Sequence, residues 1–367
     1  MTAKRWRDED YMKLALRLAR RGAGRTSPNP MVGAVIVKDN RIIGQGYHRY
    51  FGGKHAEINA IEQASEDVAG ATLYVTLEPC SHYGKTPPCV DAVIKHRLGR
   101  VVIGTLDPNP LVSGKSAMNL KEQGIPVTAG MLEASCRVLN EAHFKYMSTG
   151  VPLVTVKFAQ SIDGRIATAR GSSRGLSSAA ALRFAHRLRT MNDAILVGVG
   201  TVLADDPQLT TRLMRGKSPV RVVLDATLKI PPTTKVLSEQ EKAPTLIATT
   251  PRADKEKLAA LRGRGIETLV IPETETGGVD LGHLLRELAA RGITSVLVEG
   301  GAKVITSFLQ GNLADKLIVI ITPKILGKGI EAVGDLNITE VNQSLKLAFT
   351  RIRRLSEDLI IEAKINY

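Results

Sequence analysis

The sequence predicts an α/β protein of two domains, and three observations support this. The chain has 367 residues, more than one hydrophobic core usually serves, so two domains are expected. Short β-rich runs alternate with amphipathic helical runs, which is typical of sheets covered by helices. The alternation stops at a polar segment, YMSTGVP at Tyr146–Pro152, and then begins again. We therefore place one domain at residues 1–147 and the second at 148–367.

In the first domain the alternation starts near the N-terminus. Residues 8–21 carry apolar positions at helical spacing, and the turn residues Asp39 and Asn40 join two short strands within residues 31–48. The order then continues with a helix at 56–68, a strand at 71–77, a helix at 90–99 and a strand at 100–107. Helices are expected on both faces of this sheet.

The second domain repeats the pattern over a longer stretch. Strands are expected at 153–160, 194–200, 220–225, 244–249, 268–272, 295–300 and 316–323, with helices at 178–190 and 302–311. The tail at 345–365 predicts two strands that close the sheet. The segment Gly198–Arg212 predicts a glycine-punctuated loop.

Composition limits the class of protein. The hydrophobic fraction of 43% and the charged fraction of 23% are ordinary for a globular chain. No apolar run reaches the length of a membrane span, and the polar start is unlike a signal peptide. Three cysteines cannot form a closed disulfide framework. These features predict a cytoplasmic protein without membrane partners, in which Cys136 is a small buried apolar residue.

The formal net charge is +14. Such a charge fits nucleic-acid binding, a solvated surface or a site for a small anionic substrate. Aromatic residues make up only 4% of the chain, which leaves few platforms for stacking bases. The composition therefore favours the small anionic substrate and argues against nucleic acid.

A metal site is predicted by the stretch HAE at His55–Glu57 and by TLEPCSHYGKTPPC further on, which contains Cys80 and Cys89. One imidazole and two thiolates suit zinc, and three protein ligands leave a fourth position for water, as in catalytic zinc sites. Cys80 closes a predicted strand, and Cys89 follows two prolines at the expected start of a helix. A helix N-terminus favours a thiolate.

Glu57 is predicted to move protons in this site. Zinc lowers the pKa of its bound water, and a carboxylate nearby can take the proton and pass it to the ring nitrogen and the leaving amine. Zinc nucleobase deaminases divide the work in this way. Because positions i and i+2 do not share a helix face, His55 and Glu57 can reach one site only at the first turn.

Three alternatives stay open on these residues alone. The histidine and the thiols could be unrelated, although a Glu-Pro-Cys at a strand end beside HAE favours zinc strongly. The zinc could also be purely structural, in a binding module without catalysis. A nucleic-acid-editing deaminase of the transfer-RNA type, with a basic accessory domain, is a further possibility.

The loop between the cysteines narrows the choice. Eight residues, SHYGKTPP, separate Cys80 from Cys89, whereas cytidine and transfer-RNA deaminases usually have two. HAE, TLEPCSHYGKTPPC and TSPNPMVGAVIV at Thr26–Val37 together resemble the bifunctional riboflavin-biosynthesis deaminase–reductase family, RibD or RibG. The resemblance extends over essentially the whole chain.

The resemblance implies a cytidine-deaminase-like three-layer α/β/α domain followed by a dihydrofolate-reductase-like α/β domain. The first would deaminate diaminohydroxyphosphoribosylaminopyrimidine with Zn²⁺. The second would use NADPH to reduce the ribosyl group of 5-amino-6-(5-phosphoribosylamino)uracil to ribityl. The pyrimidine and its phosphate would be held by Asn29, His48, His82, Lys85 and Thr86.

The chemistry of these side chains agrees with that role. Lys85 and Thr86 offer a charge and a hydroxyl to a phosphate, and the amide of Asn29 can pair with a pyrimidine edge. Simpler readings remain for two of them. Asn29 before Pro30 could only form a turn, and His48 could cap a strand end.

In the second domain no G-x-G-x-x-G follows the first strand, which argues against a Rossmann-type cofactor site. The strand, Gly-Gly turn and helix of VEGGAKVITSFL at Val298–Leu309 instead offer free N–H groups to a cofactor phosphate. KFAQSIDGRIAT, GTVLADDPQLTTR and VEGG resemble the reductase half of the family.

Residue roles in this half follow from the resemblance. The ribosyl substrate would contact Lys157, Ser173, Arg189, Leu209, Arg212 and Glu299. NADPH would contact Ala159, Thr201, Asp205, Gly301, Ala302 and Lys303. Lys157 and Asp205 would polarise or orient the reactants, while Arg189 and Arg212 suit phosphate as planar forks.

One position departs from the family pattern. Gly175, in RGSSRGLSS, stands where the family usually has a tryptophan beside the nicotinamide.

The apolar sheet of the second domain also leads us to expect a homo-oligomer, a dimer or a tetramer.

Overall fold

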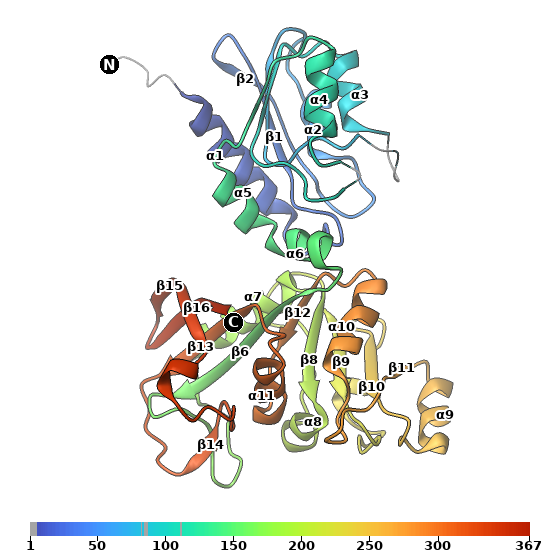
Figure 1. Cartoon of the computed structure of the whole chain (residues 1–367), viewed down its shortest axis with the longest axis vertical. Helices are drawn as coiled ribbons and strands as arrows, with labels where there is room; N and C mark the ends of the chain where they lie inside the picture. The colour runs from blue at the N-terminus through green and yellow to red at the C-terminus, as the bar shows by residue number, and fades with distance from the viewer. Residues whose placement is uncertain (1–5, 82, 84–86, 111) are drawn as a thin grey trace. The chain divides into compact units, whose positions relative to one another are not determined.

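The computed structural model describes residues 6–81, 83, 87–110 and 112–367. Two compact units make up the chain, Met1–Gly150 and Val151–Tyr367, and each is a sheet covered by helices (Figure 1). Among the described residues, no helix is both long and apolar enough to cross a bilayer.

The first unit is built on a five-stranded sheet in the described part of the chain. Its helices are α1 (Asp8–Ala19), α2 (Ala56–Glu62), α3 (Cys89–Lys95), α4 (Lys115–Glu122), α5 (Glu133–Leu139) and α6 (Glu141–Thr149), with a 3-10 turn η1 (Arg20–Gly22). Its strands are β1 (Gly33–Lys38), β2 (Arg41–Tyr47), β3 (Thr72–Val75), β4 (Arg100–Ile103) and β5 (Val127–Ala129), in the order β2-β1-β3-β4-β5.

The expected hairpin is confirmed: β1 and β2 pair antiparallel around Asp39 and Asn40, whose φ angles of 49° and 59° are those of a tight hairpin turn. Alternate residues of β1 face opposite cores. Ala34 and Ile36 pack with α2, α3 and α4, whereas Val35 packs with α1 and α5. The expected three-layer arrangement with helices on both faces is therefore present (Figure 1).

The second unit holds a nine-stranded sheet within the described residues, in the order β11-β10-β9-β8-β12-β6-β13-β16-β15. The strands are β6 (Leu153–Ser161), β8 (Ala194–Gly198), β9 (Val220–Leu224), β10 (Thr245–Thr249), β11 (Glu267–Val270), β12 (Ser295–Val298), β13 (Lys316–Thr322), β15 (Lys346–Leu355) and β16 (Asp358–Asn366). A separate pair is formed by β7 (Arg165–Thr168) and β14 (Gly329–Glu331). The helices are α7 (Ala179–Met191), α8 (Val199–Asp205), α9 (Lys255–Gly263), α10 (Leu281–Ala290) and α11 (Ala302–Gln310), with 3-10 turns η2 (Lys235–Leu237) and η3 (Val341–Gln343).

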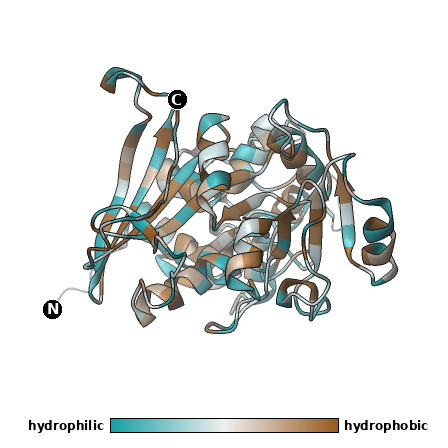
Figure 2. Ribbon diagram, turned by 90° about the horizontal axis from the view of Figure 1, so that it is seen from below, coloured by the Kyte–Doolittle hydropathy of each residue, from teal (hydrophilic) through white to brown (hydrophobic). Residues whose placement is uncertain are grey.

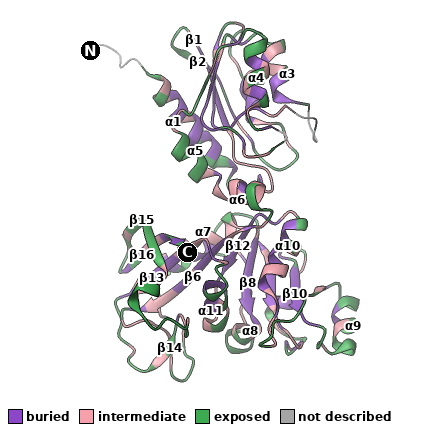
Figure 3. Ribbon diagram, in the orientation of Figure 1, coloured by how far each residue is buried: buried purple, intermediate pink, exposed green. Residues whose placement is uncertain are grey.

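The central strands of this sheet are parallel. β6, β8 and β12 are neighbours, because Val298 of β12 lies opposite Val156 of β6 and Leu196 of β8. Buried residues line these strands (Figure 3), and hydrophobic and hydrophilic residues alternate along many elements (Figure 2). Residues at the carboxyl ends of the three strands meet at one sheet edge, where open α/β sheets bind ligands.

Three expectations need correction. The helix expected at 56–68 ends at Glu62, because the following Ser and Asp residues favour turns over helix. The first half of the expected loop Gly198–Arg212 is helix α8, since good helix formers such as Leu203 and Ala204 follow directly on β8. The two tail strands extend an open sheet, and β15 is its edge strand.

Candidate active sites

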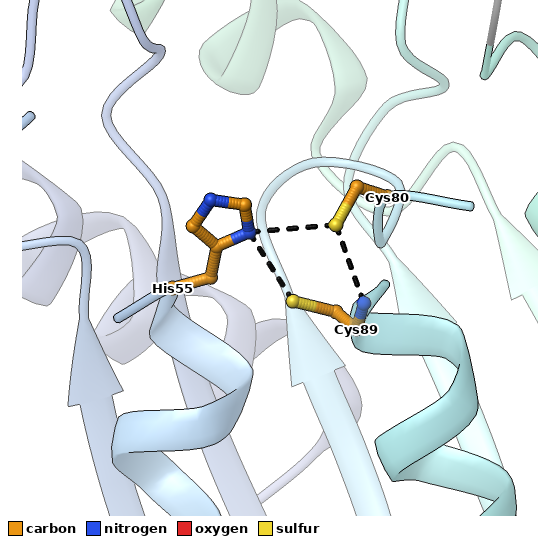
Figure 4. Close-up of side chains that lie close together, drawn as sticks. All are labelled: His55, Cys80 and Cys89. Atoms are coloured by element: carbon orange, nitrogen blue, oxygen red, sulfur yellow. Dashed lines mark hydrogen bonds between the residues drawn. The ribbon is translucent and has the colours of Figure 1, made fainter. Parts of the chain in front are cut away.

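The predicted metal ligands converge in the first unit. His55 is the N-cap residue of α2, Cys80 follows β3, and Cys89 begins α3. His55 Nδ1 lies 3.3 Å from Cys89 Sγ and 3.4 Å from Cys80 Sγ (Figure 4). The three ligand atoms all lie within 4.8 Å of one another. One ion can therefore contact all three.

The close approach of these groups shifts the pKa values of the two thiols in opposite directions. Hydrogen bonds from the Cys89 side chain, His55 and the Cys89 backbone N–H, the last at 3.2 Å, lower the pKa of Cys80 to about 4 against the effect of its burial. Hydrogen bonding to Cys80, together with burial, raises the pKa of Cys89 well above its usual value. A second thiolate here needs a cation, so this set of donors fits zinc.

Glu57 lies in the first turn of α2, beside the ligands. Its side chain is buried, and burial raises its pKa to about 7 although His55 opposes the shift. Its Oε2 atom has no hydrogen-bond partner among the described residues. A buried carboxylate oxygen without a partner is costly and is expected to meet a ligand, a metal-held water or a substrate.

Asn29 and His48 lie next to the three predicted metal ligands. The Asn29 side-chain amide approaches His48 Nε2 at 3.3 Å, and the His48 ring meets the His55 ring edge-on at 5.3 Å. Burial lowers the pKa of His48 against a hydrogen bond to the Lys54 carbonyl. Asn29 also forms the turn that its place before Pro30 suggested, through its N–H and the Thr26 carbonyl. The simpler reading of Asn29 and the functional one are thus compatible.

The remaining deaminase residues predicted from the sequence, His82, Lys85 and Thr86, lie outside the described residues.

Glu78 is a buried residue of this site that the sequence patterns did not single out. Its carboxylate accepts four backbone N–H groups at 2.9–3.3 Å, from Asp107, Gly114, Ser116 and Ala117. The Ser116 hydroxyl also donates to the Pro79 carbonyl. The start of α4 therefore holds the turn that carries Cys80. The signal available in the sequence was an acid directly before Pro-Cys.

In the second unit, a buried ion pair occupies the edge formed by β6, β8 and β12. Arg189 of α7 donates through Nε to Glu299 Oε1 at 3.1 Å and through Nη2 to Oε2 at 2.7 Å. Burial raises the pKa of Glu299, but Arg189 and Lys157 outweigh it and hold that pKa at about 2. Arg189, predicted as a phosphate fork, thus has two of its nitrogens on a carboxylate.

Lys157 completes this cluster from β6. Burial lowers the pKa of Lys157, and Arg189 lowers it further, while Glu299 opposes both. Ala159 lies two residues along the same strand and so faces the same side of the sheet. His186, one turn before Arg189 on α7, is buried, and burial with the nearby arginines lowers its pKa to about 4. His186 was not predicted; its spacing from Arg189 was the available signal.

The predicted substrate residues Leu209 and Arg212 follow α8. Arg189 Nη1 donates to the Thr210 carbonyl, and the Arg212 N–H donates to His186 Nδ1, both at 3.2 Å. Leu209 is only 3% exposed, and its side chain packs in the core with Ile195 and Val202. Leu209 can therefore meet a substrate only through its backbone.

Apart from Ala159 on β6, the predicted cofactor residues lie in the segments that follow β8 and β12. Gly301 is the N-cap residue of α11, so Ala302 and the exposed Lys303 form its first turn. A Cβ added at Gly301 would lie 3.2 Å from the Thr201 hydroxyl, which places Thr201 beside this turn. Asp205 Oδ1 lies 3.5 Å from the Ser173 hydroxyl. The arrangement provides a glycine cradle and helix N–H groups for a cofactor phosphate.

Gly175 lies in a turn with a φ of 74°, and a Cβ placed on it would meet no atom within 4 Å. The Lys324 ammonium donates to the carbonyls of Gly175 and Leu176. A lysine therefore fixes the backbone of this turn, at the position where the resemblance leads one to expect an aromatic ring.

Two family models match the chain. The RibD C-terminal domain matches residues 152–361, and the cytidine and deoxycytidylate deaminase zinc-binding region matches residues 5–105.

Curated relatives match nearly the full length. The chain is 46% identical to the riboflavin biosynthesis protein RibD of Aquifex aeolicus, covering 96% of this chain and 97% of that protein. It is 39% identical to the protein of the same name from Escherichia coli, covering 96% and 98%.

Solved structures agree. A diaminohydroxyphosphoribosylaminopyrimidine deaminase/5-amino-6-(5-phosphoribosylamino)uracil reductase from Thermotoga maritima is 40% identical, with a TM-score of 0.86 over 98% of this chain and 99% of that one. RibD from Acinetobacter baumannii, in its first form, is 38% identical, with a TM-score of 0.88 over the same shares.

Proposed function

The chain belongs to the RibD family, and on that premise we propose that it catalyses two consecutive steps of riboflavin biosynthesis. It first deaminates diaminohydroxyphosphoribosylaminopyrimidine in a zinc-dependent hydrolysis. It then reduces the ribosyl group of 5-amino-6-(5-phosphoribosylamino)uracil to ribityl with NADPH. The observation that carries this conclusion is that similarity to RibD extends over both units. The two-domain α/β fold and the cofactors Zn²⁺ and NADPH agree with the sequence-based expectation.

The alternative of a nucleic-acid-editing deaminase is not favoured, since the relatives also match the second unit as a reductase. The substrate is a small phosphorylated pyrimidine. The net charge of +14 suits such an anion.

For deamination, we assign the ligands as His55, Cys80 and Cys89. When bound, zinc lowers the pKa of a water molecule in its open position. Glu57 Oε2, buried and without a partner among the described residues, would carry the two protons of the attacking water in turn, the first to the ring nitrogen and the second to the amine that leaves as ammonia. Burial raises the pKa of Glu57, which favours uptake of a proton, whereas the positive charge of a bound zinc ion would favour its release.

The deaminase substrate is held by side chains around the three metal ligands. Asn29, which lies within hydrogen-bond reach of His48, presents an amide to the pyrimidine edge. Burial lowers the pKa of His48, which favours the neutral ring that can accept as well as donate a hydrogen bond. We assign His82, Lys85 and Thr86 to the substrate and its phosphate on the family pattern alone.

For reduction, NADPH supplies a hydride when bound, and the chain positions the reactants. We assign Thr201, Gly301, Ala302 and Lys303 to its phosphate end, with Ala159 and Asp205 nearby. Glu299, held ionised by Arg189, keeps a negative charge beside Lys157. Lys157 then polarises the ribosyl group, and Ser173, Arg212 and the Leu209 backbone bind the rest of the substrate.

We assign deamination to residues 1–147 and reduction to residues 148–367. The compact units divide three residues later, after Gly150, and the two family models fall on either side of that division.

A stepwise assay of the full chain tests the function. The pyrimidine substrate without NADPH should release ammonia and give no ribityl product. Adding NADPH should then oxidise one cofactor per ammonia released, seen as a fall in its near-ultraviolet absorbance. Deamination of RNA or single-stranded DNA, with no turnover of the ribosyl phosphate, would overturn the proposal.

We further propose that the chain forms a homo-oligomer through β15. This edge strand exposes Leu347, Phe349 and Ile352, at 40%, 62% and 56%, and an unpaired apolar edge favours pairing with a second copy. Sedimentation should give a mass that is a multiple of 39.6 kDa, and Phe349→Lys should reduce that mass to the mass of one chain.

We also place the enzyme in the cytoplasm, where its thiol ligands stay reduced.

A further inference from the structure

Arg221 is the largest side chain with no exposed surface in the described part of the chain. It lies in β9, among the apolar residues of VRVVL. Its guanidinium donates to three backbone carbonyls, those of Gln208, at 3.2 Å, Ser238, at 2.7 Å, and Ala243. Burying a cation is costly, so its partners must compensate for the lost water. A charge kept here at such a cost calls for a reason beyond filling space.

The Gln208 carbonyl belongs to the loop between α8 and β9, which carries the predicted substrate residues Leu209 and Arg212. Three other groups fix the same loop at its next positions. Arg189 binds the Thr210 carbonyl, Ser218 accepts the Thr211 N–H at 3.1 Å, and His186 accepts the Arg212 N–H. Arg189 also holds Glu299. The loop is therefore tied directly to the ion pair of the reductase site.

Leu209 sits between the two arginine-held carbonyls. Its φ of 55° is unusual for a branched residue, and its side chain is buried. Within the described residues, its N–H and that of Thr210 have no hydrogen-bond partner. The Gln208–Leu209 peptide is trans, so its carbonyl and its N–H point in opposite directions. Because Arg221 holds the carbonyl in the core, the N–H is turned away from the core.

We propose that Arg221 is a positioning residue of the reductase: it holds the Gln208 carbonyl and thereby aims the Leu209 N–H at a phosphate oxygen of the substrate. The inference rests on the proposed reductase function. Phosphate is the strongest acceptor that this substrate offers, and peptide N–H groups on a fixed loop bind it without any rearrangement. Arg212, on the same loop, adds a cation.

Substrate kinetics of Arg221→Met in the full chain test this proposal. The KM of the deaminated ribosyl phosphate should rise about tenfold or more, as expected for losing an aligned hydrogen bond to a charged group. The KM of NADPH should stay the same, and so should ammonia release, which reports on the first unit. The substrate lacking its phosphate should have the same KM in both proteins.

A matched control separates positioning from general loosening of the core. Val222→Ala changes the next residue of β9, which is equally buried but packs in a different core cluster from Leu209. It should lower the unfolding temperature of the second unit without changing the substrate KM. If Arg221→Met does not fold, Arg221→Lys is judged by the same criteria, because one ammonium cannot reach three carbonyls.

Three outcomes would overturn the inference. The first is an unchanged substrate KM, and the second is an equal rise of KM in Val222→Ala. The third is an equal rise for the substrate without phosphate. A failure of the proposed function is distinguishable, because the wild-type chain would then not oxidise NADPH with this substrate.

Discussion

Arg189 and Glu299 form a two-point ion pair, with nitrogen–oxygen distances of 3.1 Å and 2.7 Å, and their side chains are only 12% and 7% exposed. Removing one partner of such a pair strands the other charge in the interior. Arg189 also fixes the Thr210 carbonyl. The ion pair therefore contributes both to the stability of the second unit and to the geometry of its site.

Arg189→Met is expected to destabilise the second unit by about 3–5 kcal/mol and to abolish NADPH oxidation, since Glu299 loses its counter-charge. Calorimetry and the absorbance assay measure the two effects. Ammonia release by the first unit should be unchanged. Arg291→Met is the control, because Arg291 pairs with Glu287 and Glu267 at a partly exposed position and should cost about 1 kcal/mol or less. Equal losses in the two variants would contradict the account.

Glu57→Gln should lower the rate of ammonia release by about 100-fold or more, since an amide cannot shuttle a proton. Zinc content should not change, and neither should NADPH oxidation when the deaminated substrate is supplied directly. Glu62→Gln provides the control on the same helix, because Glu62 is half exposed and pairs with Lys54. Ammonia release at the wild-type rate in Glu57→Gln would show that another group moves the proton.

Glu78→Gln should weaken zinc binding by about tenfold or more, because the amide presents N–H groups to two of the four backbone donors that Glu78 now accepts. The turn carrying Cys80 would then be held less firmly. Competition with a chelator measures the affinity, and Glu122→Gln, an exposed change on α4, is the control. An unchanged affinity would mean that the anchoring of this turn does not matter to the metal.

His186 should make the second unit less stable as the pH falls from about 6.5 to about 4. Burial and the neighbouring arginines lower its folded pKa to about 4, so in this window the unfolded chain binds more protons than the folded one. The loss is at most roughly 3 kcal/mol. In His186→Asn, whose side-chain oxygen can still accept the Arg212 N–H, the unfolding temperature should depend less on pH. An identical pH dependence would contradict this.

The parts of the fold and site that could be predicted rest on local patterns. Asp39 and Asn40 tolerate positive φ, which marks the hairpin. Cys89 after two prolines marks a helix start that the structure contains. The spacing of His55, Cys80 and Cys89 predicts one cluster, and the three ligand atoms do meet.

The rest depends on contacts between distant segments. Nothing near Arg221 in the sequence indicates that its partners are carbonyls 13 to 22 residues away. Glu299 lies 110 residues from Arg189, so no local pattern indicates that the guanidinium predicted to bind phosphate also pairs with a carboxylate. The burial of Leu209 likewise follows from packing across β8 and β9, which no local pattern reports.

X-ray absorption spectroscopy of the purified enzyme, combined with metal analysis, tests the predicted zinc site directly. One zinc per chain is expected, coordinated by one nitrogen, two sulfurs and one oxygen that exchanges with solvent. A metal-free preparation that still releases ammonia would contradict the account. A zinc ion enclosed by four donors from the protein would contradict it equally.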